Sequence, residues 1–342
     1  MLSYTDTSVL VTGGTGSFGT TLIDHLLARD CAEIRVFSRD ETKQDELRNR
    51  LQGQHGVRFF LGDVRDRASV DRAMGGVDLV FHAAALKQVP SCEFFPSEAV
   101  ATNIIGSLNV IESAISHETE RVVLLGTDKA VMPINAMGMT KALMEKVGQA
   151  AARNLLRDAG PTTVSMTRYG NVLCSRGSVV PLFIEQLKRD QPLTVTDPSM
   201  TRFLLLLPAA IDLVEFSWEH GNNGDVFVRK APACTVADLA QAVQNVFDRE
   251  VGTKRIGVRH GEKLYETLAT SAELRRADDL GDYYRIRMDD RDLDYAAYFS
   301  EGERSDAALD DYHSHNTTQL DVPEVEDLLR GLPQIQAHLA SW

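Results

Sequence analysis

The sequence predicts an α/β fold built on a doubly wound parallel sheet, with a smaller C-terminal lobe. Short apolar runs rich in β-branched residues alternate with amphipathic segments through the first half of the 342-residue chain. Strands that alternate with helices pair in parallel and have both faces covered, so the strands themselves are almost wholly apolar. We predict strands over Ser8–Thr12, Ile34–Ser38, Val57–Gly62, Leu79–Ala83, Val122–Gly126 and Thr163–Arg168.

The alternation loosens after about residue 170, where several prolines mark turns between short helical segments. We therefore place a nucleotide-binding domain in residues 1–170, whose sheet can take later strands, and a second lobe in residues 171–342. Within that lobe, residues 278–316 are rich in charge and tyrosine. That composition suits a mobile lid, a docking arm or a solvated loop.

Composition excludes several classes of partner. The chain has 36 basic and 49 acidic residues, a net charge of −13, which opposes binding to nucleic acid or an anionic membrane. The apolar runs are shorter than the roughly 20 residues that span a bilayer, and the first residues lack a secretory signal, so we expect a cytoplasmic protein. The four cysteines are far apart, with no paired spacing and no clustered histidines, so we expect no metal site.

The first strand runs directly into a glycine-rich turn followed by a helical segment, 16–29. Glycine permits unusual backbone angles and lets a pyrophosphate approach the amides at a helix N-terminus, where the helix dipole favours negative charge. This strand, turn and helix predict a Rossmann-type dinucleotide site. Its candidate contacts are Gly13, Thr15, Gly16, Ser17, Phe18 and Gly19.

The second strand ends in Ser38 and Arg39, where an acid would accept the ribose hydroxyls of NAD. A serine can donate to a phosphate and an arginine can hold one, so we predict NADP. The alternative is that Asp40 turns inward and restores a preference for NAD. Further candidate cofactor contacts are Lys43, Asp63, Val64, Ala83, Ala84, Ala85 and Lys141.

The fifth strand ends in Thr127, Asp128 and Lys129, and a second motif contains Met137 and Lys141. Here the chain resembles the extended short-chain dehydrogenase/reductase superfamily, whose working trio is Ser or Thr, then Tyr, then Lys four residues later. Thr127 and Lys141 fit that trio. Met137 stands at the tyrosine position and can neither give nor take a proton; simple core packing is its alternative role.

Within that superfamily the chain resembles the bacterial polysaccharide-biosynthesis branch, and the resemblance extends to His313–Thr317. It implies a UDP-N-acetylglucosamine 4,6-dehydratase, of the subgroup that carries methionine for tyrosine and also inverts carbon 5. Such an enzyme oxidises carbon 4, eliminates water across carbons 5 and 6, and returns the hydride to carbon 6 from a tightly held cofactor. The motifs that carry the resemblance are Ser38–Glu41, Ala85–Pro90, Thr127–Ala130, Arg168–Val172 and Arg259–Lys263.

The resemblance assigns the dehydratase roles to two adjacent residues, Asp128 as the acid and Lys129 as the base. An ordinary lysine has a pKa of about 10.4, so a lysine base needs a pKa lowered by burial or by nearby positive charge. Lys141 is a candidate source of that charge. The alternative for the pair is a salt-bridged surface turn. Two groups are candidates to accept the 4-hydroxyl proton, a neutral Lys129 and an ordered water. Thr127 is the candidate that orients this hydroxyl.

A UDP-sugar carries two phosphates, so we expect arginine and amide donors in the second lobe. Glu262 and Glu266 fall four residues apart on an expected helix after Gly261, where they point to solvent or pair with Lys263 and Arg259. Candidate substrate contacts are Lys87, Asn171, Arg176, Ser178, Val179, Arg202, Arg259 and Glu262.

Two other functions stay open. A 4-epimerase needs oxidation and re-reduction at carbon 4 but no acid and base for elimination, so Asp128 and Lys129 favour the dehydratase. A dinucleotide-binding regulator without catalysis fits the missing tyrosine but not the retained Lys141. The helices predicted at 96–116 and 137–157 are candidates for the four-helix contact by which the superfamily forms dimers, and hexamers also occur among its relatives.

Overall fold

The computed structural model describes residues 4–175, 177–289 and 309–342. Its centre is a nine-stranded sheet with the order β13-β14-β9-β6-β5-β4-β1-β2-β3. The seven strands from β9 to β3 are parallel, whereas β14 and β13 add antiparallel at one edge. These observations confirm the α/β class with a doubly wound parallel sheet.

All six predicted strands are present. Their ends agree with the prediction to within one residue, because five of them are mostly buried apolar runs that stop at a polar or glycine residue, whereas β3, at the sheet edge, is only partly buried. The bounds are β1 (Ser8–Thr12), β2 (Glu33–Ser38), β3 (Val57–Leu61), β4 (Leu79–His82), β5 (Arg121–Leu125) and β6 (Thr163–Arg168).

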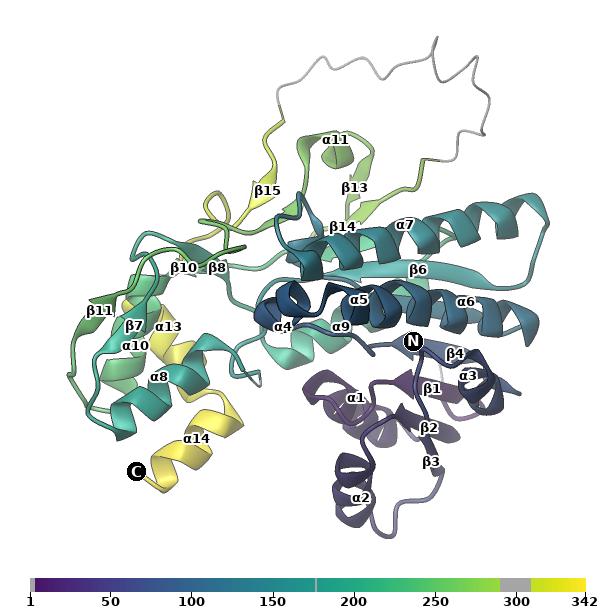
Figure 1. Cartoon of the computed structure of the whole chain (residues 1–342), viewed down its shortest axis with the longest axis horizontal. Coiled ribbons are helices and arrows are strands. Elements are labelled where there is room, and N and C mark those ends of the chain that lie inside the picture. The colour runs from purple at the N-terminus through teal and green to yellow at the C-terminus, as the bar shows by residue number, and fades with distance from the viewer. Residues whose placement is uncertain (1–3, 176, 290–308) are drawn as a thin grey trace.

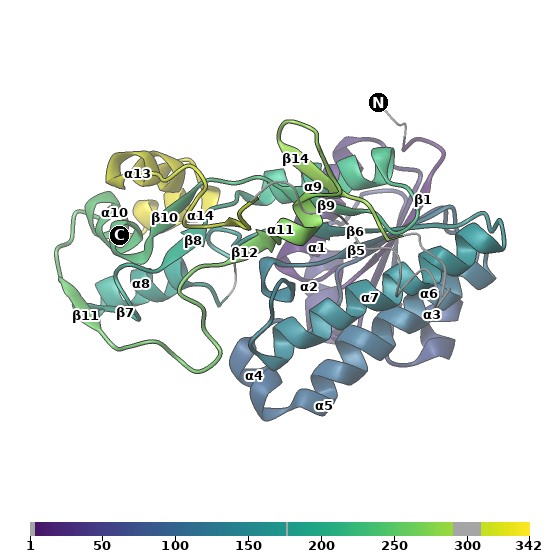
Figure 2. The ribbon, with the colours of Figure 1, turned by 90° about the horizontal axis from the view of Figure 1, so that it is seen from above.

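Helices cover both faces of the sheet (Figures 1 and 2). One face carries α1 (Ser17–Ala28) and α9 (Leu207–His220), and the opposite face carries α3 (Arg67–Met74), α6 (Gly106–Ser116) and α7 (Ala136–Arg157). The remaining helices of the first half are α2 (Glu41–Arg50), α4 (Val89–Phe94) and α5 (Pro96–Ala99).

The helix predicted over 96–116 is continuous but not uniform. Between α5 and α6 it makes a π-helical turn, η1 (Val100–Ile105), and π-turns are frequent at functional sites. The stretch has the length and mean hydropathy of a membrane-spanning helix, yet half of it is buried within the protein. Its packing against α3 and α7 is that of a core helix in a globular fold.

Three strands of the sheet come from the second half of the chain: β9 (Val226–Arg229), β13 (Ala277–Asp279) and β14 (Tyr283–Ile286). The segment predicted as a lid, arm or loop, 278–316, thus begins as edge strands and ends near β15 (Tyr312–His313), which pairs with β12 (Thr267–Ala269). Residues 290–308 of that segment lie outside the described residues. The domain boundary at residue 170 stays a prediction.

The other elements form a smaller lobe beside the sheet, on the left of Figure 1. Its own apolar core includes Phe183, Leu239, Val325 and Leu329. Its elements are α8 (Val179–Lys188), β7 (Leu193–Val195), β8 (Thr201–Phe203), β10 (Ala233–Thr235), α10 (Val236–Val246), β11 (Thr253–Arg255), α13 (Val322–Arg330) and α14 (Pro333–Ala340), and the short α11 (Ser271–Leu274) lies nearer the sheet.

Candidate active site

A cavity of about 1110 Å³ lies between the carboxyl ends of the parallel strands and the smaller lobe. The strand order reverses between β1 and β4, the point at which open α/β sheets bind their ligands. Every described residue predicted to contact cofactor, substrate or reacting groups lines this cavity except Asp128, which is buried beneath it. Arg176 lies outside the described residues.

The glycine turn between β1 and α1 has no room for side chains. Gly13 has φ +69°, and a Cβ there would stand 2.8 Å from the amide nitrogen of Ala84. A Cβ on Gly19 would stand 2.5 Å from the carbonyl oxygen of Gly13. The turn therefore brings bare backbone and the N-terminus of α1 to the cavity, which is the cradle that a pyrophosphate requires.

The end of β2 supplies a hydroxyl and a guanidinium to the same cavity. Ser38 Oγ lies 2.7 Å from Thr15 Oγ1, and Arg39 is half exposed with its Nη1 3.6 Å from Asp63 Oδ2. The Asp40 carboxylate accepts a hydrogen bond from the Lys43 amide and pairs with Lys43 Nζ, so it caps α2. Asp40 is thus engaged with its own helix.

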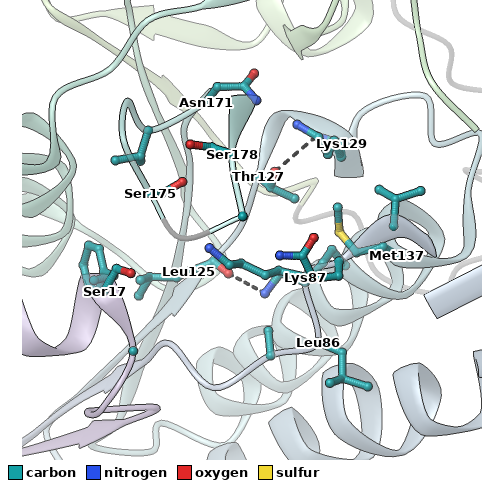
Figure 3. A pocket seen from close by; sticks show the side chains of 18 of the residues that line it. Ser17, Leu86, Lys87, Leu125, Thr127, Lys129, Met137, Asn171, Ser175 and Ser178 are labelled. Carbon is teal, nitrogen blue, oxygen red and sulfur yellow. Dashed lines mark hydrogen bonds between the residues drawn. The ribbon is translucent and has the colours of Figure 1, made fainter. Parts of the chain in front are cut away.

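Asp128 and Lys129 begin a single 3-10 turn, η2 (Asp128–Ala130), directly after β5. Asp128 Oδ1 accepts hydrogen bonds from Thr127 Oγ1 at 2.8 Å and from Lys129 Nζ at 3.0 Å. Asp128 Oδ2 is buried and has no hydrogen-bond partner among the described residues. Figure 3 shows Thr127 and Lys129 among the side chains that line the pocket, together with Asn171 and Ser178. Asp128 is buried and Lys129 is partly buried at the cavity wall, so the pair does not form an exposed surface turn.

The predicted lowering of the Lys129 pKa is wrong for this arrangement. Burial favours the neutral amine, but the carboxylates of Asp128 and Glu266 outweigh it and raise the pKa of Lys129 above its ordinary value. Arg202 is the neighbouring cation that opposes them. Lys129 is consequently an ammonium ion held between two carboxylates, and it needs a proton acceptor before it can act as a base.

Glu266 is the acidic residue that sequence reasoning misplaced. The expected helix after Gly261 does not form, and Glu266 is 3% exposed at the cavity wall, with Oε1 3.6 Å from Lys129 Nζ. It precedes β12, whose pairing with β15 brings this stretch against η2. No local pattern carries that information, because the pairing joins segments more than 40 residues apart.

Lys141 and Met137 occupy the two helical positions of the superfamily trio. Lys141 is buried, and its Nζ donates to the carbonyl oxygen of Leu125 at the end of β5. Burial lowers the pKa of Lys141 to about 8, against the opposing charge of Glu145. Met137 packs with Cys92 and Ala99 and also lines the cavity, so its packing role and its place in the site are compatible.

Asn103, in the π-turn, is a second residue that sequence reasoning missed. Its side chain accepts from the Leu86 amide at 2.8 Å and donates to the Leu86 carbonyl at 3.0 Å and to Thr140 Oγ1. It thereby ties the cavity-lining segment after β4 to α7, which carries Lys141. An asparagine in an apolar helical stretch was the available signal.

On the lobe side, two residues of the cavity lining each carry a buried polar atom that is unpaired among the residues that the structure describes. Asn171 Oδ1 and Ser178 Oγ have no hydrogen-bond partner in the described part of the chain. Ser178 stands at the N-cap of α8, whose first turn, including Val179, lines the cavity. The Ser178 hydroxyl at this helix N-terminus suits an anionic group, whereas Asn171 Oδ1 suits a hydrogen-bond donor.

Two candidate substrate contacts of the smaller lobe, Arg202 and Glu262, contact one another. Arg202 Nη2 lies 3.4 Å from Glu262 Oε1 and donates to the carbonyl of Lys263, whereas Arg259 is exposed at the cavity rim. Within the described ranges, no group of three or more His, Cys, Asp or Glu side chains is placed to hold a metal ion.

Comparisons with known proteins cover nearly the whole chain. Residues 9–288 match the family model described as polysaccharide biosynthesis protein, and residues 289–336 match its C-terminal companion. A protein of Rickettsia felis named UDP-glucose 4-epimerase is 53% identical over 340 residues, 98% of this chain and 99% of that protein.

Solved structures show the same architecture. The structure named Pen from Bacillus thuringiensis is 34% identical, with a TM-score of 0.87 over 97% of this chain and 100% of its own. DesIV, a dTDP-glucose 4,6-dehydratase of Streptomyces venezuelae solved with NAD and TYD bound, is 21% identical, with a TM-score of 0.69 over 86% of this chain and 94% of its own. The DesIV likeness is one of fold. From the matches to both family models, this chain belongs to the polysaccharide biosynthesis protein family.

Proposed function

We propose that the chain is a nucleotide-sugar enzyme, a UDP-N-acetylglucosamine 4,6-dehydratase that also inverts carbon 5, in the synthesis of amino sugars for a surface polysaccharide. The observation that carries this proposal is the hydrogen-bonded pair of buried Asp128 and partly buried Lys129 after β5, with Thr127 beside it. Elimination of water needs an acid and a base together, and oxidation at carbon 4 alone does not.

The chemistry explains why the pair must act within a redox cycle. The proton on carbon 5 becomes acidic only when carbon 4 is a ketone, and a bound nicotinamide dinucleotide supplies that change by holding the carbon 4 hydride and returning it to carbon 6. Lys129 then takes the carbon 5 proton while Asp128 protonates the departing 6-hydroxyl. Thr127 orients the 4-hydroxyl.

NADP is the cofactor that the residues favour. The bare backbone of the Gly13–Gly19 turn would hold the pyrophosphate, and Ser38 and Arg39 would hold the ribose phosphate. Asp40 does not compete for the ribose, because its carboxylate caps α2. Ser178 and the first turn of α8 would bind the substrate diphosphate, and Asn171 Oδ1 would accept a hydrogen bond from a donor group of the substrate.

A 4-epimerase is the second candidate, favoured by the name of the Rickettsia felis relative. It would use Thr127 and Lys141 in the same way. It gives no task to a buried aspartate with a free oxygen beside a lysine, and such an aspartate is costly to bury.

Turnover in deuterated water distinguishes these functions. The protein would be incubated with NADP and UDP-N-acetylglucosamine, and the product examined by mass and proton spectra. Loss of water with deuterium at carbon 5 is the expected result. An unchanged mass with an inverted carbon 4 would establish the epimerase, and no turnover would favour a binding protein.

We also propose that the chain forms a homo-oligomer. Large apolar side chains are exposed on two neighbouring helical segments, Val100 and Ile105 on η1 and Met139 and Leu143 on α7. A second copy placed against these helices would cover them, as in a four-helix contact.

A further inference from the structure

We infer that Glu266 is the third member of the acid–base site, a positioning residue that takes the proton of Lys129 Nζ and returns it during the elimination. This inference rests on the proposed dehydratase function. It starts from the cluster of Asp128, Lys129 and Glu266, in which one amine lies between two carboxylates, with Nζ 3.0 Å from Asp128 Oδ1 and 3.6 Å from Glu266 Oε1.

One oxygen of the Glu266 carboxylate has no structural role in the described part of the chain. Its Oε2 is fully buried and has no hydrogen-bond partner among the described residues, as is also true of Asp128 Oδ2. An unpaired carboxylate oxygen in a dry site costs free energy and is retained where it has a task. Burial raises the pKa of Glu266, with the charges of Lys129, Arg202 and Lys263 opposing the rise.

The backbone around Glu266 is fixed from the far end of the chain. The Glu266 amide donates to Ser314 Oγ at 3.0 Å, and the Ser314 amide donates to the Glu266 carbonyl at 2.8 Å. Thr201 Oγ1 contacts Ser314 Oγ at 2.7 Å, which ties this clamp to β8. The sequence motif His313–Thr317 therefore has a structural role, because its buried Ser314 holds Glu266 against the acid–base pair.

The two other cations near the cluster, Arg202 and Lys263, have partners of their own. Arg202 pairs with Glu262, and Lys263 Nζ donates to the carbonyl oxygen of Val131 at 2.6 Å. The relay starts with an ammonium on Lys129, a proton on Asp128 and a carboxylate on Glu266, and the charges of these three groups then sum to zero.

The relay balances in protons. An N–H bond of Lys129 breaks and an O–H bond forms at Glu266, leaving a neutral amine and a neutral acid. The amine takes the carbon 5 proton, the C–H electron pair forms the new carbon–carbon double bond, and the carbon–oxygen bond at carbon 6 breaks as Asp128 protonates the leaving hydroxyl to water. Lys129 then passes a proton to Asp128 and accepts the one stored on Glu266, which restores the starting state of the three groups. The proton that the 4-hydroxyl loses on oxidation balances the proton that carbon 5 gains when the hydride returns to carbon 6.

The test uses three variants. Glu266→Gln keeps the shape but cannot take a proton, Glu266→Asp keeps a titratable carboxyl, and Glu33→Gln is the control because Glu33 is an ion-paired glutamate on β2 outside the cavity lining. We expect Glu266→Gln to lose water at least ~100-fold more slowly, while NADP binding persists and reduced nicotinamide accumulates in a single turnover. Glu266→Asp should recover part of the rate.

A second readout does not require turnover. Removing a negative charge beside Lys129 lowers its pKa, so in Glu266→Gln we expect Lys129 to react with acetic anhydride at least about tenfold faster, as measured by peptide mass spectrometry. The inference is overturned if Glu266→Gln retains the wild-type rate of water loss or the wild-type reactivity of Lys129. Absence of water loss in the wild-type protein would instead refute the dehydratase function, and the reactivity of Lys129 would then decide on Glu266 by itself.

Discussion

At the scale of single residues, the site depends on which charges are buried together. Lys129 lies between Asp128 and Glu266 and is held as an ammonium, whereas Lys141, one helix away, has only Glu145 to oppose its burial. Two lysines that line one cavity therefore have pKa values displaced in opposite directions. This division gives them separate tasks, since Lys129 exchanges protons and Lys141 loses its charge at mildly alkaline pH.

The titration of Lys141 predicts a measurable pH dependence of stability. Its pKa is about 8 in the folded protein against an ordinary 10.5. Below pH 8 both states bind the proton and the folded state bears the full cost of a buried ammonium. Between pH 8 and 10.5 only the unfolded state keeps the proton, so the free energy of unfolding rises with pH.

Urea unfolding over this pH range should show that rise in the wild-type protein and a smaller one in Lys141→Met. Identical pH dependence in the two proteins would mean that Lys141 does not titrate as described.

Arg39 is predicted to set the cofactor preference. Arg39→Ala removes the guanidinium that would pair with the ribose phosphate, so the Kd for NADP should rise by roughly 10- to 100-fold, the loss of a charge-assisted hydrogen bond. The Kd for NAD, which lacks that phosphate, should change little. Calorimetric titration with both cofactors measures the two Kd values. An equal loss of affinity for NADP and NAD would show that Arg39 does not set the cofactor preference.

At the scale of elements, the parts predicted best are those set by local sequence. The Gly13–Gly19 turn and the strands β1 to β6 follow from residues next to each other in the chain. Glu266 was misplaced because its surroundings come from β12 and β15, and the short stretch itself carries a helical spacing of charge. The π-turn was missed since its extra residue leaves no mark on apolar periodicity.

The tight turn after β1 gives an element-scale prediction. Gly19→Ala places a Cβ 2.5 Å from a carbonyl oxygen, so the turn must open, and we expect dinucleotide affinity to fall and the protein to lose about 1–3 kcal/mol of stability. Gly75→Ala is the matched control, because the nearest atom to its Cβ would be 3.9 Å away. Thermal unfolding and cofactor titration compare the two, and equal behaviour would contradict the close approach.

At the scale of the whole molecule, the two halves of the chain complete one site. The first half of the chain supplies the glycine turn, the Asp128–Lys129 pair and Lys141 on α7, and the later segments supply Asn171, Ser178 and Glu266. The division into lobes at residue 170, expected from the less regular alternation of strands and helices, stays a prediction. The return of β9, β14 and β13 to the central sheet was allowed but not specified, since edge strands this short carry little periodicity.

The proposed oligomer is tested at this scale. Ile105→Glu combined with Leu143→Glu places charges on the exposed apolar face of η1 and α7, and the molar mass from light scattering should fall below that of the wild-type protein. Ile256→Glu, on an exposed residue of the smaller lobe, is the control and should leave the mass unchanged. A wild-type protein that is already monomeric would contradict the proposal.

The central claim is that Lys129 removes the carbon 5 proton in an elimination that follows oxidation at carbon 4. The most direct measurement is a single turnover of Lys129→Ala with NADP and UDP-N-acetylglucosamine, following reduced nicotinamide by absorbance and water loss by mass. The account predicts that nicotinamide is reduced while water loss slows by about 10²- to 10⁴-fold, the contribution of a general base. Water loss at the wild-type rate, or a 4-epimer formed by wild type and variant alike, would contradict it.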